Sequence, residues 1–196
     1  YQNADYAKTY RQLVDKVRAA EAQLGGEKLT RAVATFAAKL MAYKDEYEVA
    51  RLFADPAYMR SVKDQFGEGA KIKFYLAPPI LSEKDSNGRL MKKRFGSWML
   101  PVMKGMQKFK SLRGTRFDPF GWTAERKMER RLRDEYLARI DAMLGVLNET
   151  NLDLAVDIAS IPDEIRGYGH VKDAAVEAAE TRLNDLMTQW NEGAAK

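Results

Sequence analysis

The sequence predicts a mainly α-helical bundle of six to eight helices, with a short β-ribbon or irregular basic insertion near residues 71–95. Three observations support this prediction. Apolar residues recur every three or four positions over most of the chain, which is the spacing of one helical face. Hydrophobic residues make up 45% of the 196 positions, enough for a core. The two-residue alternation of a strand is confined to one short stretch.

We expect residues 1–196 to form a single accessory domain, because this length suits one large domain or two small ones. The chain begins at Tyr1 without an initiator methionine, so we interpret it as a fragment of a longer chain. No repeat of fixed period interrupts this organisation.

The first third of the chain predicts three helices. The first covers about residues 5–24 and ends at Gly25-Gly26. A longer second helix is expected over about residues 27–53. Asp55-Pro56 predicts the start of a third, short helix, because aspartate caps helices and proline suits the first helical position. This helix should end near Phe66, before two glycines.

The pattern changes at Lys71, where KIKFYL alternates polar and apolar residues as a strand does. Pro78-Pro79 ends this stretch, and Asn87-Gly88 is a strong two-residue turn signal. If residues 89–95 are also extended, residues 71–95 form a small ribbon or an ordered arm.

Helix returns at about Ser97, with Pro101 near the first turn, where proline is tolerated. Its apolar face is expected to consist of Trp98, Val102, Met103, Met106 and Phe109.

Residues 113–122 predict a turn-rich connector, after which Thr123 caps a long helix over about residues 124–148. Asn151 opens an apolar helix that Pro162 interrupts, and the last helix starts near His170. We expect Val171, Ala175, Ala178, Leu186 and Trp190 to lie along one face of that last helix.

Positive charge is concentrated in one part of the chain. Residues 84–133 hold 15 Lys and Arg against four Asp and Glu, an excess of +11, while the whole chain carries only +5. Such an asymmetry predicts an acidic partner or a phosphate-bearing ligand. The acidic residues of 125–136 alternate with arginines, however, which is typical of a solvated helix face and argues against a nucleic-acid interface.

The chain has no cysteine and a single histidine. This composition excludes disulfides, thiolate catalysis and thiolate-held clusters or zinc within these residues. It also fits a reducing compartment, and we expect a cytoplasmic protein. No apolar run approaches the roughly 20 residues needed to cross a bilayer, so we expect no membrane partner.

The connector RGTRFDPFGW contains three candidate interaction residues, Arg113, Arg116 and Asp118. Asp118 precedes proline and is expected to be extended, where its carboxylate can pair with either arginine. The loop then either grips a carboxylate or phosphate through an arginine, or is a well-packed structural connector. The second interpretation is favoured.

IRGYGHVK contains three further candidates, Arg166, Tyr168 and His170. His170 is expected in the first turn of the last helix, where the helix N-terminus disfavours its protonation. A neutral imidazole there either meets a ligand or is a packed, hydrogen-bonded residue that fixes the approach of two helices. The structural interpretation is favoured, because no nucleophile or second histidine completes a catalytic set.

Two charged stretches complete the candidates. AYKDEYEVARL (42–52) offers no two carboxylates on one helix face, so we expect solvated or interhelix ion pairs and not an acid–base pair. Lys92, Lys93 and Arg94 lie in the basic segment and are candidates for docking an acidic partner.

Six stretches together resemble, in order, the C-terminal segment of the long, fused indolepyruvate ferredoxin oxidoreductases, which belong to the 2-oxoacid:ferredoxin oxidoreductases. They are YAKTYRQLVDKVRAAE, LMAYKDEYEVARLFADP, KFYLAPPIL, FGSWMLPVMKG, LRGTRFDPFGWTAERKMER and IPDEIRGYGHVK. The resemblance covers nearly the whole chain.

The resemblance implies a parent enzyme that oxidatively decarboxylates an aryl 2-oxoacid on thiamine diphosphate with Mg²⁺. Electrons then pass through [4Fe–4S] clusters to ferredoxin, and coenzyme A takes up the acyl group. It implies that these cofactors are bound by other domains, that this segment has no catalytic, cofactor or metal residue, and that it is inactive alone. The implied partners are those other domains, ferredoxin and coenzyme A; a basic helical module that binds nucleic acid or protein is the alternative.

Overall fold

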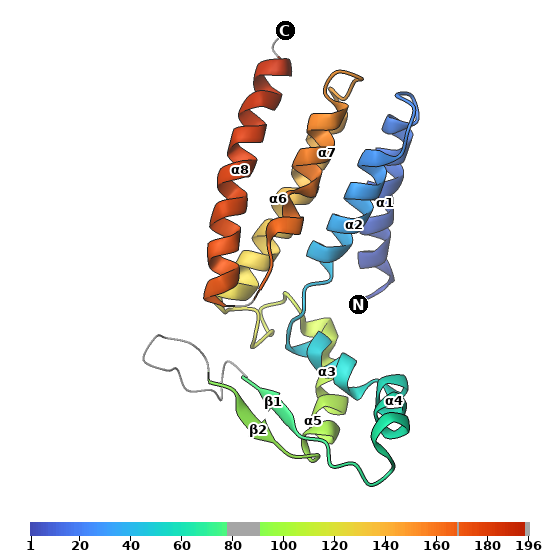
Figure 1. The fold of residues 1–196 in the computed structure, drawn as a ribbon, viewed down its shortest axis with the longest axis vertical. Helices are drawn as coiled ribbons and strands as arrows, with labels where there is room; N and C mark the ends of the chain where they lie inside the picture. The colour runs from blue at the N-terminus through green and yellow to red at the C-terminus, as the bar shows by residue number, and fades with distance from the viewer. Residues whose placement is uncertain (78–90, 168, 195–196) are drawn as a thin grey trace. The chain divides into compact units, whose positions relative to one another are not determined.

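The computed structural model describes residues 1–77, 91–167 and 169–194 (Figure 1). These residues contain eight α-helices, two 3₁₀ helices and one two-stranded antiparallel sheet, which confirms the prediction of a mainly α fold with a small ribbon. They fall into two compact units, described separately below. Unit 1 comprises Tyr1–Gln2 and Lys44–Lys127, and unit 2 comprises Asn3–Tyr43 and Met128–Lys196. The expectation of a single domain stays a prediction.

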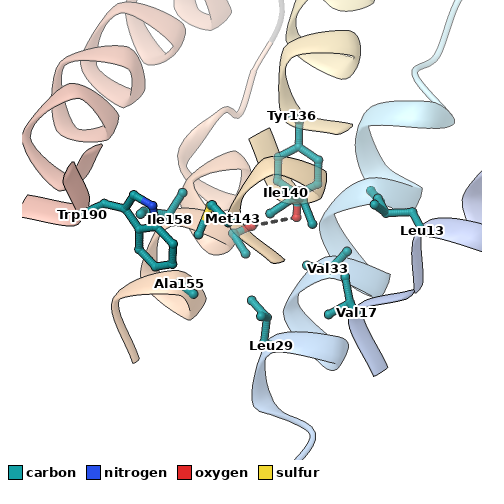
Figure 2. Packing of buried hydrophobic residues seen from close by; sticks show 12 residues of the cluster. Leu13, Val17, Leu29, Val33, Tyr136, Ile140, Met143, Ala155, Ile158 and Trp190 are labelled. Atoms are coloured by element: carbon teal, nitrogen blue, oxygen red, sulfur yellow. Dashed lines mark hydrogen bonds between the residues drawn. The ribbon is translucent and has the colours of Figure 1, made fainter. Parts of the chain in front are cut away.

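Unit 2 is built from helices whose apolar faces meet in one core. Its elements are α1 (Ala4–Glu21), α2 (Lys28–Met41), most of α6 (Ala124–Leu144), α7 (Leu152–Ser160), the 3₁₀ helix η2 (Ile161–Glu164) and α8 (His170–Ala194). Figure 2 shows side chains from all five α-helices converging in this core, with Trp190 contributed by α8. The Tyr136 hydroxyl donates a 3.0 Å hydrogen bond to the Ala159 carbonyl, so the one polar atom of that ring is satisfied inside the core.

A buried carboxylate joins α1 to α2. Glu21, at the end of α1, is 0% exposed and accepts hydrogen bonds of 2.8 Å from the backbone N–H groups of Leu29 and Thr30. The Thr30 hydroxyl donates a third, at 2.7 Å. Because the first N–H groups of a helix have no partner within it, Glu21 supplies the cap that the position before α2 does not provide.

Unit 1 packs short helices against the ribbon. It contains α3 (Glu46–Ala54), α4 (Pro56–Phe66), β1 (Phe74–Leu76), β2 (Lys93–Phe95), α5 (Met99–Met106), the 3₁₀ helix η1 (Gln107–Leu112) and the start of α6. The strands pair Phe74 with Phe95, Tyr75 with Arg94 and Leu76 with Lys93. Ala50, Ala54, Phe74, Met99 and Met103 form its small core.

Several helix boundaries follow the local signals. Asp55 accepts hydrogen bonds from the N–H groups of Ala57 and Tyr58, and Pro56 is the first residue of α4, as predicted. Thr123 accepts a 3.3 Å hydrogen bond from the Arg126 N–H at the start of α6. The Pro78-Pro79 and Asn87-Gly88 signals lie outside the described residues.

The single helix expected over residues 27–53 is wrong. The chain leaves helical geometry after α2, and α3 begins anew with Asp45 as its N-cap. The Asp45 carboxylate accepts a 2.8 Å hydrogen bond from the Glu48 N–H, so this residue serves a helix start and not a helix interior.

The apolar faces expected for α5 and α8 need correction. In α5, Met99 and Met103 are buried, whereas Trp98 and Val102 are exposed. In α8, Val176 and Ala179 are buried and Val171 is exposed. The rest of the prediction is confirmed in part: Met103 and Met106 of α5 and Leu186 and Trp190 of α8 do contact a core.

We expect Val33→Ala to lower the free energy of unfolding by about 2 kcal/mol, because the side chain is fully buried in the core of unit 2. Val146→Ala removes the same atoms from a half-exposed side chain and should change the free energy of unfolding by less than about 0.5 kcal/mol. Urea denaturation of both variants measures the difference; equal losses would contradict the assigned core.

Candidate functional site

Unit 1 contains an open groove of about 590 Å³. It lies between the end of α3, the start of α4, and α5 with η1. Its charged lining residues are Arg51, Asp55, Lys104 and Lys108, and Pro101 and Gly105 lie between them. Three cations against one carboxylate favour an anionic ligand or an acidic protein surface.

Arg51 is held in position at this groove by Glu48. Its Nη2 and Nε atoms donate to the two carboxylate oxygens of Glu48 at 2.7 and 2.9 Å, the bidentate geometry that arginine favours. Burial opposes ionisation of Glu48, but the Arg51 hydrogen bond and charge outweigh it, so the pKa of this carboxyl lies below its usual value. The same hydrogen bond raises the pKa of Arg51, and its guanidinium stays charged.

Asp55 is occupied by its capping role. The N–H groups of Tyr58 and Ala57 stabilise its charged form and lower its pKa, so the carboxylate is ionised at neutral pH. Its charge therefore offsets part of the positive field in the groove.

A buried ion pair lies within unit 1, on α3 and the connector. Arg113 donates from Nε and Nη2 to the two oxygens of Asp45, the Nη2 bond measuring 2.9 Å, and both side chains are only 3% exposed. The Arg113 guanidinium also lies 3.9 Å from the centre of the Tyr1 ring, within cation–π range.

Asp118 organises the connector from the inside. It is 3% exposed and accepts hydrogen bonds from the Tyr47 hydroxyl at 3.2 Å and from the N–H groups of Gly114 and Phe120 at 2.8 and 3.1 Å. Burial, together with the Asp118 charge, raises the pKa of Tyr47, so the phenol remains a donor. A Cβ on Gly121 would come within 2.5 Å of the Asp118 carboxylate, so a larger residue does not fit there.

These contacts favour the structural interpretation of the connector. Arg113 pairs with Asp45 and Asp118 with Tyr47, in place of the expected pairing of Asp118 with an arginine of the connector. Arg116 is exposed and lies 5.3 Å from the Phe117 ring.

The charged stretch 42–52 makes ion pairs, as predicted. Besides the Glu48–Arg51 pair, Glu46 of α3 accepts a 3.3 Å hydrogen bond from Arg126 of α6. Burial raises the pKa of Glu46, and the Arg126 charge opposes that shift.

The basic residues of β2 lie on an accessible ribbon. Lys92 and Arg94 are exposed and Lys93 is half-buried. Arg94 pairs in register with Tyr75, and both of these side chains are exposed. This ribbon can contact a partner through charge and an aromatic ring together.

The remaining candidates belong to unit 2. The Nη2 atom of Arg166 donates to both carboxylate oxygens of Asp163, at 2.9 and 3.0 Å. His170 is the first residue of α8, as predicted, but it is exposed, so the interpretation of it as a packed residue is wrong. Gly167 and Gly169, which precede α8, both have positive φ angles, a conformation that glycine adopts readily. Tyr168 lies outside the described residues.

Sequence reasoning missed Arg51, Lys104 and Lys108 as lining residues of one groove. The available signals were Glu48, three residues before Arg51, and the four-residue spacing of the two lysines beside Pro101. Among the described residues, no three His, Cys, Asp or Glu side chains gather as metal ligands do. Within the same residues, no helix is both long and apolar enough to cross a membrane.

We expect Asp45→Ala to lower the free energy of unfolding by about 3–5 kcal/mol, because it leaves the Arg113 charge buried without its carboxylate. Asp141→Ala removes an exposed partner of Lys16 and should cost less than about 1 kcal/mol. Chemical denaturation compares the two. If both variants lose a similar free energy of unfolding, the buried pair stabilises the protein no more than an exposed one.

No curated protein and no solved structure matches the chain. One family model, described as a family of unknown function (DUF6537), matches residues 1–185. This match covers unit 1 and most of unit 2, including every charged residue of the groove. The chain therefore belongs to the DUF6537 family.

Proposed function

We propose that this chain is a non-catalytic accessory part of a thiamine-diphosphate-dependent indolepyruvate (2-oxoacid) ferredoxin oxidoreductase. Its unit 2 supports domain assembly and its unit 1 docks the acidic ferredoxin. The resemblance of six stretches to the C-terminal segment of these enzymes supports the first part. The proposal includes a cytoplasmic, reducing compartment, consistent with the absence of cysteine.

The observation that carries the docking role is the charge of unit 1. Its residues include 18 Lys and Arg against 10 Asp and Glu, a net charge of +8, while unit 2 has 15 against 18. Exposed members of this set lie on the ribbon, as Lys92 and Arg94, and in the groove, as Lys104 and Lys108. A positive surface steers an acidic protein toward it and increases the association rate.

The cofactors of such an enzyme are assigned to its other domains. The chain has no cysteine to hold an iron–sulfur cluster, and the described residues offer no group of carboxylates and histidines for Mg²⁺. The contribution of this chain is then binding and orientation, with the chemistry carried out elsewhere in the enzyme.

We expect the combined reversal Lys92→Glu, Lys93→Glu and Arg94→Glu in the full enzyme to raise the KM for ferredoxin by about tenfold at low ionic strength. The difference from wild type should shrink toward 1 M salt, where charges are screened beyond about 3 Å. Steady-state ferredoxin reduction with indolepyruvate measures this effect.

The control reverses Lys8, Arg11 and Lys28, three exposed residues of unit 2, and changes the net charge by the same amount. An equal effect of both triple variants, or none from the first, would contradict docking at the ribbon. A rise confined to the KM for coenzyme A would instead assign the ribbon to that ligand's phosphates.

The alternative of a nucleic-acid-binding module makes a different prediction. DNA or RNA should then bind with a Kd below about 10⁻⁶ M at physiological salt, tighter than typical non-specific binding. A salt-titrated binding assay on the full chain checks this, and we expect no such affinity.

A further inference from the structure

Two sets of apolar residues lie along α5 and its N-cap residue Trp98, and only one set meets the core. Met99 and Met103 are 7% and 1% exposed and pack in the core of unit 1. Trp98 and Val102, one turn apart on a neighbouring face, are 61% and 48% exposed. Phe109 of η1 is 58% exposed. A single scattered apolar residue on a surface is ordinary, but an apolar stripe of this kind indicates an interaction site.

Exposed apolar side chains are characteristic of unit 1 as a whole. Of the twelve exposed large hydrophobic residues in the described part of the chain, ten belong to unit 1. Since unit 2 exposes only two of these residues, unit 1 is the better candidate for a contact surface.

The stripe lies beside the groove. At 100° per residue, Pro101 and Gly105 of α5 project next to Val102, and Lys108 of η1 lines the same groove. The groove that these residues line can receive an apolar side chain of a partner. We call Trp98, Val102 and Phe109, together with the groove, the α5 surface.

The charges around the α5 surface have one predominant sign. Lys104 and Lys108 are exposed in the groove, Lys110 is exposed on η1, and Arg51 is oriented by Glu48. Asp55 is the one carboxylate among the lining residues, and it is engaged in capping α4. An apolar centre with a charged rim is typical of protein interfaces, and small ones serve transient electron-transfer complexes.

We infer that the α5 surface is the docking site of the acidic acceptor protein, whose apolar contact residues cover Trp98 and Val102 while its carboxylates meet Lys104 and Lys108. This inference rests on the proposed function and adds a second contact area to the ribbon. The two areas differ in kind: the ribbon attracts by charge, whereas the α5 surface also buries apolar area and so slows dissociation.

The test uses the full enzyme with Val102→Asp and, separately, with Lys104→Glu and Lys108→Glu combined. Val146→Asp is the matched control, because Val146 is 50% exposed in unit 2. The readouts are the KM for ferredoxin, the ratio of ferredoxin-dependent to artificial-acceptor rates, the melting temperature and the sedimentation coefficient. We expect each α5 variant to raise the KM for ferredoxin at least tenfold, with the control within twofold of wild type.

The possible results separate this inference from the proposed function. If reversal of the ribbon charges raises the KM and the α5 variants do not, ferredoxin docks elsewhere on unit 1 and the α5 inference is overturned. If neither set raises it, both are overturned. If every α5 variant loses rate equally with ferredoxin and with the artificial acceptor, the α5 surface packs against catalytic domains. If Val102→Asp sediments as a smaller oligomer, the surface packs against a second copy of the chain. Either result overturns the inference.

Discussion

Unit 1 depends on the buried pair between Asp45 and Arg113. These residues are 68 positions apart, and their contact fixes the connector against the start of α3. Asp45 also caps α3, so one carboxylate satisfies a helix end and a buried guanidinium at once. Removing two charges from water is costly, and such a pair is retained only when its geometry and hydrogen bonds are good. The groove and the exposed face of α5 are presented by a framework held in this way.

Net positive charge and most of the exposed large apolar side chains of the described residues belong to unit 1. Unit 2 follows the usual logic of amphipathic helices around one core. Unit 1 leaves aromatic rings exposed, and aromatic residues are enriched at protein interfaces. The proposal that unit 2 supports assembly while unit 1 docks a partner is based on this difference in apolar exposure.

Adjacent residues in the sequence correctly predicted those features of the fold that depend on short-range hydrogen bonds. The Asp55-Pro56 start of α4 and the Thr123 cap of α6 are confirmed, because each depends on neighbours in the chain. The ribbon is confirmed as well, although its strands pair residues 17 to 21 positions apart. The break between α2 and α3 depends on Asp45, whose partner Arg113 is distant in sequence. Periodicity likewise gives the faces of α5 without saying which one meets the core. The groove joins residues from three α-helices and the 3₁₀ helix η1, which no single stretch of sequence reveals.

The order of the two units along the chain has a consequence for synthesis. The ribosome produces α1 and α2 first, then the 84 residues of Lys44–Lys127, and only afterwards most of α6, with α7 and α8. At typical elongation rates the first helices wait about 4–17 s for the partners that complete their core. During this interval the Glu21 cap joins α1 to α2, whereas nearly all of unit 1 emerges without interruption. A chaperone that shields nascent apolar surface therefore has its longest opportunity at the α1–α2 hairpin.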